Sequence, residues 1–209
     1  MPIINTKNYK YGNELLALAY KIQKYTPKAI ICVPATEITA ISKHTKLKVY
    51  AQHVGFSEPS KRGTGYVTPE AVKEAGAQGT LLNHSEHKLS FSNLKRTVND
   101  CKKIGLKTIV FAASLAEARK IKALKPYAIA YEDPKLVASG KSITNYRAEE
   151  ILKFVKLLEN SEVIPLCGAG ISDEKDVKAA LMLGCEGVLI ASAIAKSKNP
   201  EKLLKKISK

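Results

Sequence analysis

The sequence predicts an α/β protein, a single-domain (β/α)8 barrel, and two observations predict this fold. First, eight short apolar runs rich in Ile, Val, Leu and Ala recur at fairly even intervals along the 209 residues. These runs are continuous, which is typical of parallel strands that are covered on both faces. Second, segments with helical periodicity separate the runs. Eight strand–helix units favour a closed barrel, because closure leaves no edge strand.

The predicted strands follow one another along the whole chain, and they are residues 2–5, 29–34, 47–52, 79–84, 107–112, 127–132, 162–168 and 186–192. A chain of 209 residues is short for eight strand–helix units, so we expect trimmed helices. No linker rich in Pro, Gly or Ser interrupts the pattern. We therefore expect residues 1–209 to form one domain.

Capping residues mark where several of the predicted helices begin and end. The pairs Thr68-Pro69 and Asn199-Pro200 each place a capping side chain before a proline at the first helical position. The stretch Ser114–Glu117 has the spacing of a capping box. Gly105 and Gly184 lie where helix C-terminal caps belong, which predicts the ends of two further helices.

The composition is that of an ordinary soluble protein, with 45% hydrophobic and 25% charged residues. The first residues do not resemble a signal peptide, and no apolar run approaches 18 residues, so we expect a cytoplasmic protein with no membrane partner. The four cysteines, Cys32, Cys101, Cys167 and Cys185, form no C-x-x-C pair. They favour buried thiols in a reducing compartment over a disulfide framework or a zinc site.

The net charge of +15 is the one unusual bulk property. A basic balance can indicate binding to nucleic acid or to an anionic substrate. Here the lysines are scattered along helix-like segments, and no RNA-binding signature with stacked aromatic residues is present. Lysine-rich, solvated helix faces are therefore favoured, and a basic nucleic-acid-binding barrel is the less favoured alternative.

Polar residues gather where the predicted strands end. The first, fourth, sixth, seventh and eighth strands end in Asn5–Lys7, Asn83–Glu86, Tyr131–Pro134, Cys167–Gly170 and Ala191–Ser192. Active sites of such barrels lie at the carboxyl ends of the strands. A lysine, a histidine and a glutamate should therefore converge at one end, beside two loops of small residues.

This set of side chains fits a specific kind of chemistry. Moving a proton between the carbons next to a carbonyl group requires a base, a donor to the enolate oxygen and a fixed positive charge. Loops of small residues allow backbone N–H groups to approach an anion such as phosphate. Glu132 closes an apolar strand, where a carboxylate needs either a partner or a use.

Over essentially its whole length, the sequence resembles triosephosphate isomerase and is most similar to the short archaeal forms. The matching stretches are NTKNY (5–9), AQHVG (51–55), GTGYVTPEAVKEAGAQGTLLNHSEHK (63–88), YEDPKLVASG (131–140), CGAGIS (167–172) and GVLIASA (187–193). The histidine–serine–glutamate motif combined with the glutamate loop after the sixth strand is specific to this family.

The resemblance implies a TIM-barrel isomerase that interconverts dihydroxyacetone phosphate and D-glyceraldehyde 3-phosphate through an enediolate, in glycolysis and gluconeogenesis. Glu132 would be the base, and His84 the neutral electrophile. This family is itself the standard example of a histidine kept neutral by a helix N-terminus. Lys7 would be the fixed cation, Asn5 would add a supporting hydrogen bond, and Glu86 would position Lys7. The resemblance implies no cofactor and no metal.

The resemblance also implies how the phosphate is held. Its contacts would come from backbone N–H groups at Ala138, Gly170 and the Ala191–Ser192 pair, with residues 133–140 as a mobile lid. Five residues depart from the family pattern. Asp133 replaces a usual proline, Ala138 replaces a glycine, and Ala191–Ser192 replaces a common Gly-Gly pair. Tyr66 stands where a glutamate often follows Thr-Gly after the third strand.

The connection from His53 to Thr68 is long for a compact barrel, so it requires a purpose. The resemblance implies that this loop docks into a neighbouring subunit, with Thr64 near Asn5 and His84 of the partner subunit. We therefore expect a homo-oligomer, either a dimer or a tetramer, that needs no nucleic acid. The alternative enzyme is another phosphate-binding barrel, such as an aldolase, which fits less well because Lys7 lies on the first strand.

Overall fold

The computed structural model describes residues 1–55, 63–136 and 142–208. Within them, eight parallel strands form a closed barrel in chain order, and β1 pairs with β8. The strands are β1 (Pro2–Asn5), β2 (Ile30–Val33), β3 (Lys48–Ala51), β4 (Gly79–Leu82), β5 (Lys107–Ala112), β6 (Ala128–Tyr131), β7 (Ile164–Cys167) and β8 (Gly187–Ile190). The barrel prediction is therefore confirmed, and each strand lies inside its predicted range.

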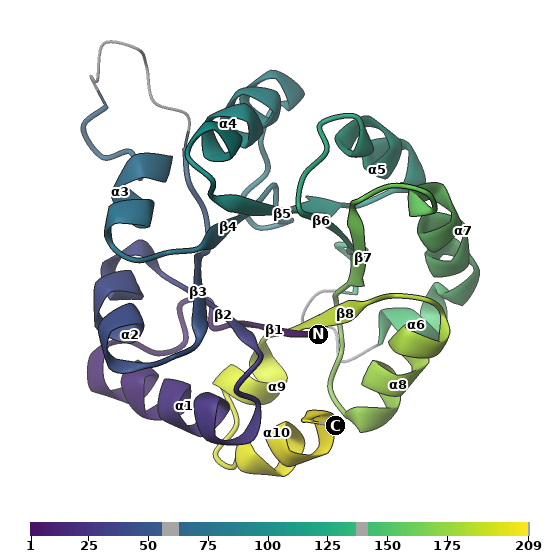
Figure 1. Ribbon diagram of the computed structural model, residues 1–209. Helices are drawn as coiled ribbons and strands as arrows, with labels where there is room; N and C mark the ends of the chain where they lie inside the picture. Colours follow the sequence, from purple (N-terminus) through teal and green to yellow (C-terminus); the bar gives the residue numbers. More distant parts are fainter. Residues whose placement is uncertain (56–62, 137–141, 209) are drawn as a thin grey trace.

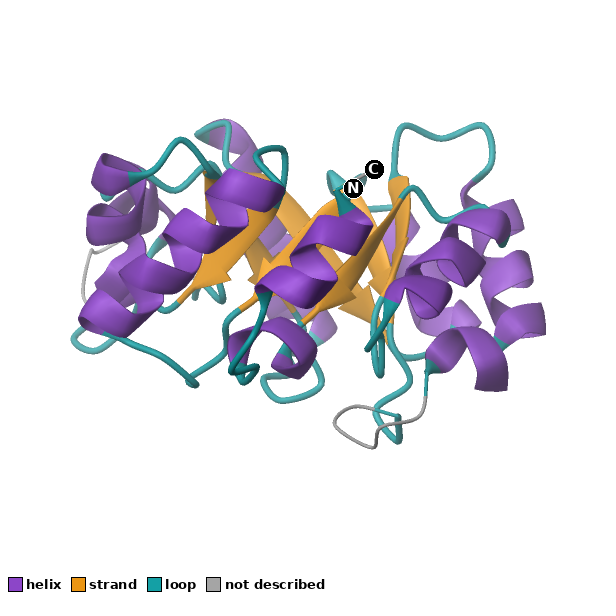
Figure 2. Ribbon diagram, turned by 90° about the horizontal axis from the view of Figure 1, so that it is seen from below, coloured by secondary structure: helices purple, strands orange, loops and turns teal. Residues whose placement is uncertain are grey.

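Helices surround the strands on the outside of the barrel, as Figure 1 shows along the barrel and Figure 2 from the side. They are α1 (Gly12–Tyr25), α2 (Ile38–His44) after a 3₁₀ turn η1 (Ala35–Glu37), α3 (Pro69–Glu74), α4 (Phe91–Lys103), α5 (Leu115–Lys122), α6 (Ile143–Tyr146), α7 (Ala148–Leu158), α8 (Glu174–Met182), α9 (Ser192–Ala195) and α10 (Glu201–Ile207). Several are trimmed as predicted: α3 has 6 residues, and α6 and α9 have 4 each.

The strands separate two hydrophobic cores, which explains why the apolar runs are continuous. Ile3 and its equivalents on other strands fill the barrel interior, whereas Ile4 and its equivalents pack against the helices. Tyr50 is among the largest fully buried side chains, and it fits because its neighbour on β4 is Gly79. A Cβ atom at Gly79 would collide with the Tyr50 ring, so this close packing requires glycine.

Most of the predicted helix caps are confirmed. The Thr68 side chain accepts a hydrogen bond from the Ala71 N–H at the start of α3. Gly105 and Gly184 follow α4 and α8 with φ angles of 72° and 92°, in the left-handed region. The prediction for Asn199 is wrong. Because Pro200 itself is the N-terminal cap of α10, the helix starts one residue later, without a side-chain cap.

The predicted capping box at Ser114–Glu117 is only half formed. Ser114 Oγ accepts from the Glu117 N–H at 3.1 Å. The Glu117 carboxylate does not bond back to the N–H of Ser114. It accepts instead from the Ala113 N–H at 2.8 Å and from the Asn83 side chain, at the end of β4, at 2.7 Å. These two contacts replace the bond to Ser114.

The four cysteines are buried, as predicted, and carry free thiols. Among the helices of the described residues, none is long and apolar enough to cross a membrane.

Candidate active site

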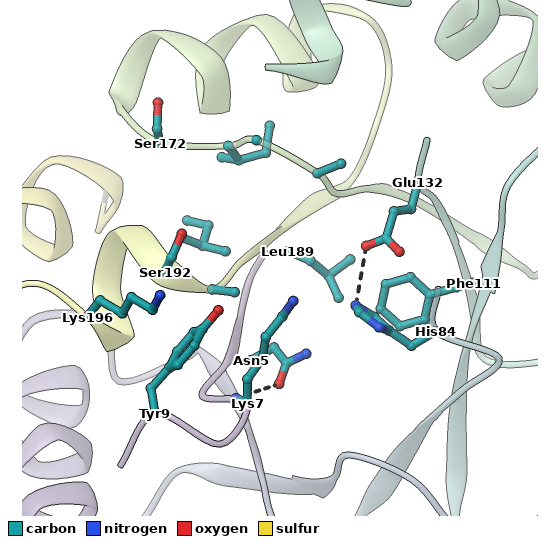
Figure 3. A pocket seen from close by; sticks show the side chains of 15 residues that line it. Asn5, Lys7, Tyr9, His84, Phe111, Glu132, Ser172, Leu189, Ser192 and Lys196 are labelled. Carbon is teal, nitrogen blue, oxygen red and sulfur yellow. Dashed lines mark hydrogen bonds and ion pairs between the residues drawn. The ribbon is translucent and has the colours of Figure 1, made fainter. Parts of the chain in front are cut away.

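A cavity of about 380 Å³ opens at the carboxyl ends of the strands. Its lining residues come from the ends of β1, β4, β5, β6, β7 and β8, and they are Asn5, Lys7, Tyr9, His84, Phe111, Glu132, Ala169, Gly170, Ile171, Ser172, Leu189, Ile190, Ala191, Ser192 and Lys196. Figure 3 shows the side chains around this cavity. The structure therefore brings together in one pocket the predicted residues from β1, β4, β6, β7 and β8.

Glu132 follows β6 directly and is 5% exposed. Its Oε2 lies 3.4 Å from His84 Nε2, and the two side chains point toward each other across the pocket (Figure 3). Its Oε1 is buried and has no hydrogen-bond partner within the described residues. A buried carboxylate oxygen without a donor is costly, so this oxygen is available for a proton or a ligand.

The tautomer of His84 is set by the backbone. The Glu86 N–H donates a hydrogen bond to His84 Nδ1 at 3.1 Å, which confirms the predicted turn after β4. Because an amide N–H is always a donor, Nδ1 must be the acceptor, and the ring proton is on Nε2. Burial lowers the pKa of His84 below its ordinary 6.5; Glu132 opposes this shift, and Lys7 adds to it. The imidazole is therefore neutral at pH 7.

Asn83 fixes the direction in which His84 leaves its strand. It is buried and has a φ of 60°, in the left-handed region that asparagine tolerates. Its Nδ2 donates to the Phe111 carbonyl at 2.9 Å and to Glu117 Oε1 at 2.7 Å. Its Oδ1 accepts from the Leu89 N–H at 3.1 Å. Glu117 thus supports the turn that carries His84, a role that the sequence pattern did not predict.

We expect Glu117→Gln to lower kcat about tenfold, with KM changed less. The glutamine NH2 group would face an N–H donor, of either Asn83 or Ala113, where a carboxylate oxygen now accepts a hydrogen bond. The free energy of unfolding should fall by about 1–2 kcal/mol for the same reason. Steady-state kinetics and thermal unfolding would measure both effects. Lys88→Gln is the matched control, since it removes the Lys88–Glu117 ion pair of 2.8 Å and leaves the bond between Asn83 and Glu117 in place. An equal loss of kcat in both variants would contradict a role through Asn83.

Lys7 is held from two sides at the mouth of the pocket. Its Nζ lies 2.6 Å from Glu86 Oε1, the contact that was predicted to position it. Asn5 Oδ1 accepts from the Lys7 backbone N–H at 3.0 Å, and Gln52 Nε2 donates to the Lys7 carbonyl at 2.9 Å. Lys7 has a φ of 45°, so these contacts hold a left-handed backbone that places the ammonium group in the pocket. The contribution of Gln52 was not predicted.

Small residues and a second cation line the side of the pocket that is formed by the segments after β7 and β8. Ala169 and Gly170 are consecutive left-handed residues, with φ angles of 75° and 70°, in the loop after β7. The predicted pair Ala191–Ser192 lies where α9 begins. Lys196 also lines this side, with Nζ 4.5 Å from the centre of the Tyr9 ring, and neither residue was predicted. Lys196 would therefore supply positive charge to an anionic group that binds on this side of the pocket.

Ala138, the fourth predicted phosphate contact, lies outside the described residues, as does the rest of residues 137–141. Groups of three or more His, Cys, Asp or Glu side chains that could hold a metal ion are absent from the part of the chain that the structure describes.

A family model described as Triosephosphate isomerase matches residues 1–207. The chain belongs to the triosephosphate isomerase family. It is 36% identical to the triosephosphate isomerase of Methanocaldococcus jannaschii, over 99% of this chain and 98% of that relative. The corresponding enzyme of Saccharolobus solfataricus is 39% identical, over 97% and 92%. A crystal structure of triosephosphate isomerase from Bartonella henselae has the same fold, with a TM-score of 0.73, 20% identity and 90% coverage of both chains.

The family pattern is altered where the predicted lid begins. Asp133 Oδ2 lies 2.9 Å from Arg147 Nε, and Arg147 Nη1 lies 3.1 Å from Glu150 Oε1. The Tyr131 hydroxyl donates to the other oxygen of Glu150 at 3.1 Å. Asp133 is therefore an anchor, and through Arg147 it ties the end of β6 to the start of α7.

Thr64 is exposed and does not line the catalytic pocket of its own chain. It lies instead at a second cavity, beside His53 and His87, whose rings stack with centroids 3.9 Å apart. Burial lowers the pKa of His53 to about 4, and the neighbouring His87 adds to this effect.

His53 should make the fold of this triosephosphate isomerase family member sensitive to acid. Its pKa in the folded chain is about 4, whereas its ordinary value is 6.5, so the unfolded chain takes up the proton first as the pH falls. The free energy of unfolding should therefore decrease between pH 6.5 and about pH 4. We expect His53→Gln to flatten this dependence in thermal melts, and the exposed control His44→Gln to leave it unchanged. If the stability of His53→Gln changes with pH as steeply as that of the parent, His53 is not the group responsible.

Proposed function

We propose that the chain interconverts dihydroxyacetone phosphate and D-glyceraldehyde 3-phosphate in the cytoplasm, with Glu132 moving the proton between C1 and C2. The observation that carries this proposal is the convergence of Glu132, His84 and Lys7 on one pocket, with Glu132 Oε2 3.4 Å from His84 Nε2. Membership of the triosephosphate isomerase family supports the choice of substrate.

Each side chain has one task in the reaction. The Glu132 carboxylate, whose Oε1 has no partner among the described residues, removes a proton from one carbon and returns it to the neighbouring carbon. The Nε2–H of His84 donates to the oxygens of C1 and C2 as negative charge develops on them. A neutral ring suits this task, because a donor that stays neutral does not trap the enediolate as an ion pair. Lys7 supplies a permanent positive charge close to those oxygens.

The phosphate group lies on the side of Gly170 and the Ala191–Ser192 pair, whose backbone N–H groups donate to it. Lys196 contributes positive charge beside these donors. The apolar side chains of Leu189 and Ile171 line the same pocket and limit the access of water to the enediolate.

A coupled assay of the purified chain, run in both directions with each triose phosphate, tests the reaction. We expect conversion in both directions, and its absence would refute the proposed activity. A Schiff-base aldolase is a poorer candidate, because the lysines that line the described pocket are Lys7, which is paired with Glu86, and Lys196 at its rim. Retention of a borohydride-trapped substrate would favour that enzyme instead.

The proposal includes a homo-oligomer, either a dimer or a tetramer, in which Thr64 contacts a neighbouring subunit. Its exposure at the surface beside His53 and His87 is compatible with such a contact. Light scattering at micromolar concentration measures the mass directly. A monomeric mass would contradict this part of the proposal without affecting the reaction.

A further inference from the structure

A third cavity, of about 770 Å³, lies at the end of the barrel opposite the catalytic pocket. Its walls are the start of β5, the residues just before β6 and β7, and the turns that follow α4, α5 and α7, which are neighbours in the helical ring (Figure 1). Four lysines line it, Lys102, Lys107, Lys122 and Lys125, together with the single carboxylate of Glu162. The cleft is therefore strongly cationic.

Some lysines of the described residues form ion pairs with carboxylates, although most do not. Exposed lysines elsewhere form ion pairs, for example Lys21 with Glu201 and Lys178 with Glu174 at 2.7 Å. Within residues 1–55, 63–136 and 142–208, none of the four cleft lysines takes part in an ion pair. Among the described residues, Glu162 is the one carboxylate that lines the cleft beside these four positive charges.

The cleft lysines are nevertheless held in place. Lys102 Nζ donates to the Leu124 carbonyl at 2.5 Å, and Lys122 Nζ donates to the Leu157 carbonyl at 2.7 Å. Each bond uses one of three ammonium hydrogens, so both groups keep donors for a ligand. Lys107 Nζ lies 4.4 Å from the centre of the Tyr127 ring, a cation–π contact that fixes its side chain.

Capping of helix C-termini explains two of the four lysines. Lysines near helix C-termini stabilise the last carbonyl groups, which accounts for Lys102 and Lys122. Lys107 begins β5, and Lys125 lies in the turn before β6 with a φ of 49°. Neither residue belongs to the last turn of a helix. All four nevertheless line the same cleft, and a cleft lined by charges of one sign favours the binding of a counter-ion.

We propose that this cleft binds a linear polyphosphate, either inorganic or as the triphosphate group of a nucleotide. Ammonium groups are point charges that suit phosphate oxygens, and four of them around a cavity of about 770 Å³ match a chain of phosphates better than a single one. The cavity volume is in the range of small-molecule sites. The site is separate from the proposed isomerase reaction and does not depend on it.

Calorimetric titration with inorganic tripolyphosphate tests the site, with the catalytic pocket of the full-length chain saturated by glycerol 3-phosphate. We expect binding to one site per chain that weakens as salt is added. Lys107→Gln/Lys125→Gln should raise Kd about tenfold or more, because each lysine provides a charge-assisted hydrogen bond. Lys43→Gln/Lys153→Gln removes the same charge from exposed positions outside the cleft and should change Kd less than about twofold.

Glu162→Gln gives an independent test that does not remove any cleft lysine. Loss of this exposed carboxylate should lower Kd about two- to threefold and leave isomerase activity and melting temperature unchanged. A titration with ATP distinguishes the two kinds of ligand. An affinity for ATP no higher than that for tripolyphosphate indicates inorganic polyphosphate, whereas a higher affinity for ATP indicates a nucleotide. The proposal is overturned by absent tripolyphosphate binding, by equal losses in the two lysine double variants, or by binding of duplex DNA alone.

Discussion

Glu132→Gln is expected to lower kcat by roughly 10³-fold, because glutamine keeps the shape of the side chain but cannot accept the proton. KM should change little, since Glu132 makes no predicted contact with the phosphate. The melting temperature should stay the same or rise. The substitution removes a charge from a side chain that is 6% exposed, and its Oε1 has no partner among the described residues.

These two results together separate a catalytic base from a structural carboxylate. A carboxylate that supports the fold would lower the melting temperature when it is replaced, whereas a base loses activity alone. Glu74→Gln, at an exposed position on α3, is the matched control and should retain parental kcat. Parental kcat in Glu132→Gln would refute the proposed mechanism, even if the chain is an active isomerase.

Lys7→Met should lower kcat/KM by roughly 10²- to 10³-fold, because it removes the fixed positive charge beside the developing enediolate. It should also change the pH dependence. Burial, Lys7 and Lys88 lower the pKa of His84, whereas Glu132 and Glu86 raise it, so loss of Lys7 removes one of the lowering effects. The pKa of His84 then rises, and the acid limb of the profile of kcat/KM against pH moves to higher pH.

Two further variants separate the charge of Lys7 from its effect on His84. Lys7→Met/Glu86→Gln removes both partners of the 2.6 Å ion pair, so the acid limb should return toward its parental position while kcat/KM stays low. Lys10→Met breaks only the exposed contact of 3.5 Å with Glu14 and should leave kcat/KM within about twofold of the parent. A parental kcat/KM in Lys7→Met would contradict the assigned role.

The barrel and the convergence of Lys7, His84 and Glu132 could be predicted because both depend on chain order. A continuous apolar run predicts a strand buried on two faces, and closure of eight parallel strands places all their carboxyl ends together. The chemical roles of these residues came instead from the resemblance to a known family, and they remain predictions. That the chain is one domain remains an expectation too.

The contacts that support the site could not be predicted, because they join residues far apart in the sequence. Glu117 has the spacing of a local capping box, yet its carboxylate is turned toward Asn83, 34 residues away. Nothing in the local pattern distinguishes these two outcomes. Lys196 and Tyr9 likewise meet only because α9 follows β8 and β8 pairs with β1. Periodicity locates elements, but side-chain direction depends on which neighbour is closer.

The hydrogen bond from the Glu86 N–H to His84 Nδ1 has a consequence for how this site can evolve. The donor belongs to the peptide group, so nineteen of the twenty amino acids supply it equally, and only proline at position 86 lacks it. The protonation pattern of the ring is thus protected against nearly all substitutions at that position. Natural variation at residue 86 can therefore change the ion pair with Lys7 while the imidazole of His84 keeps its orientation and its proton.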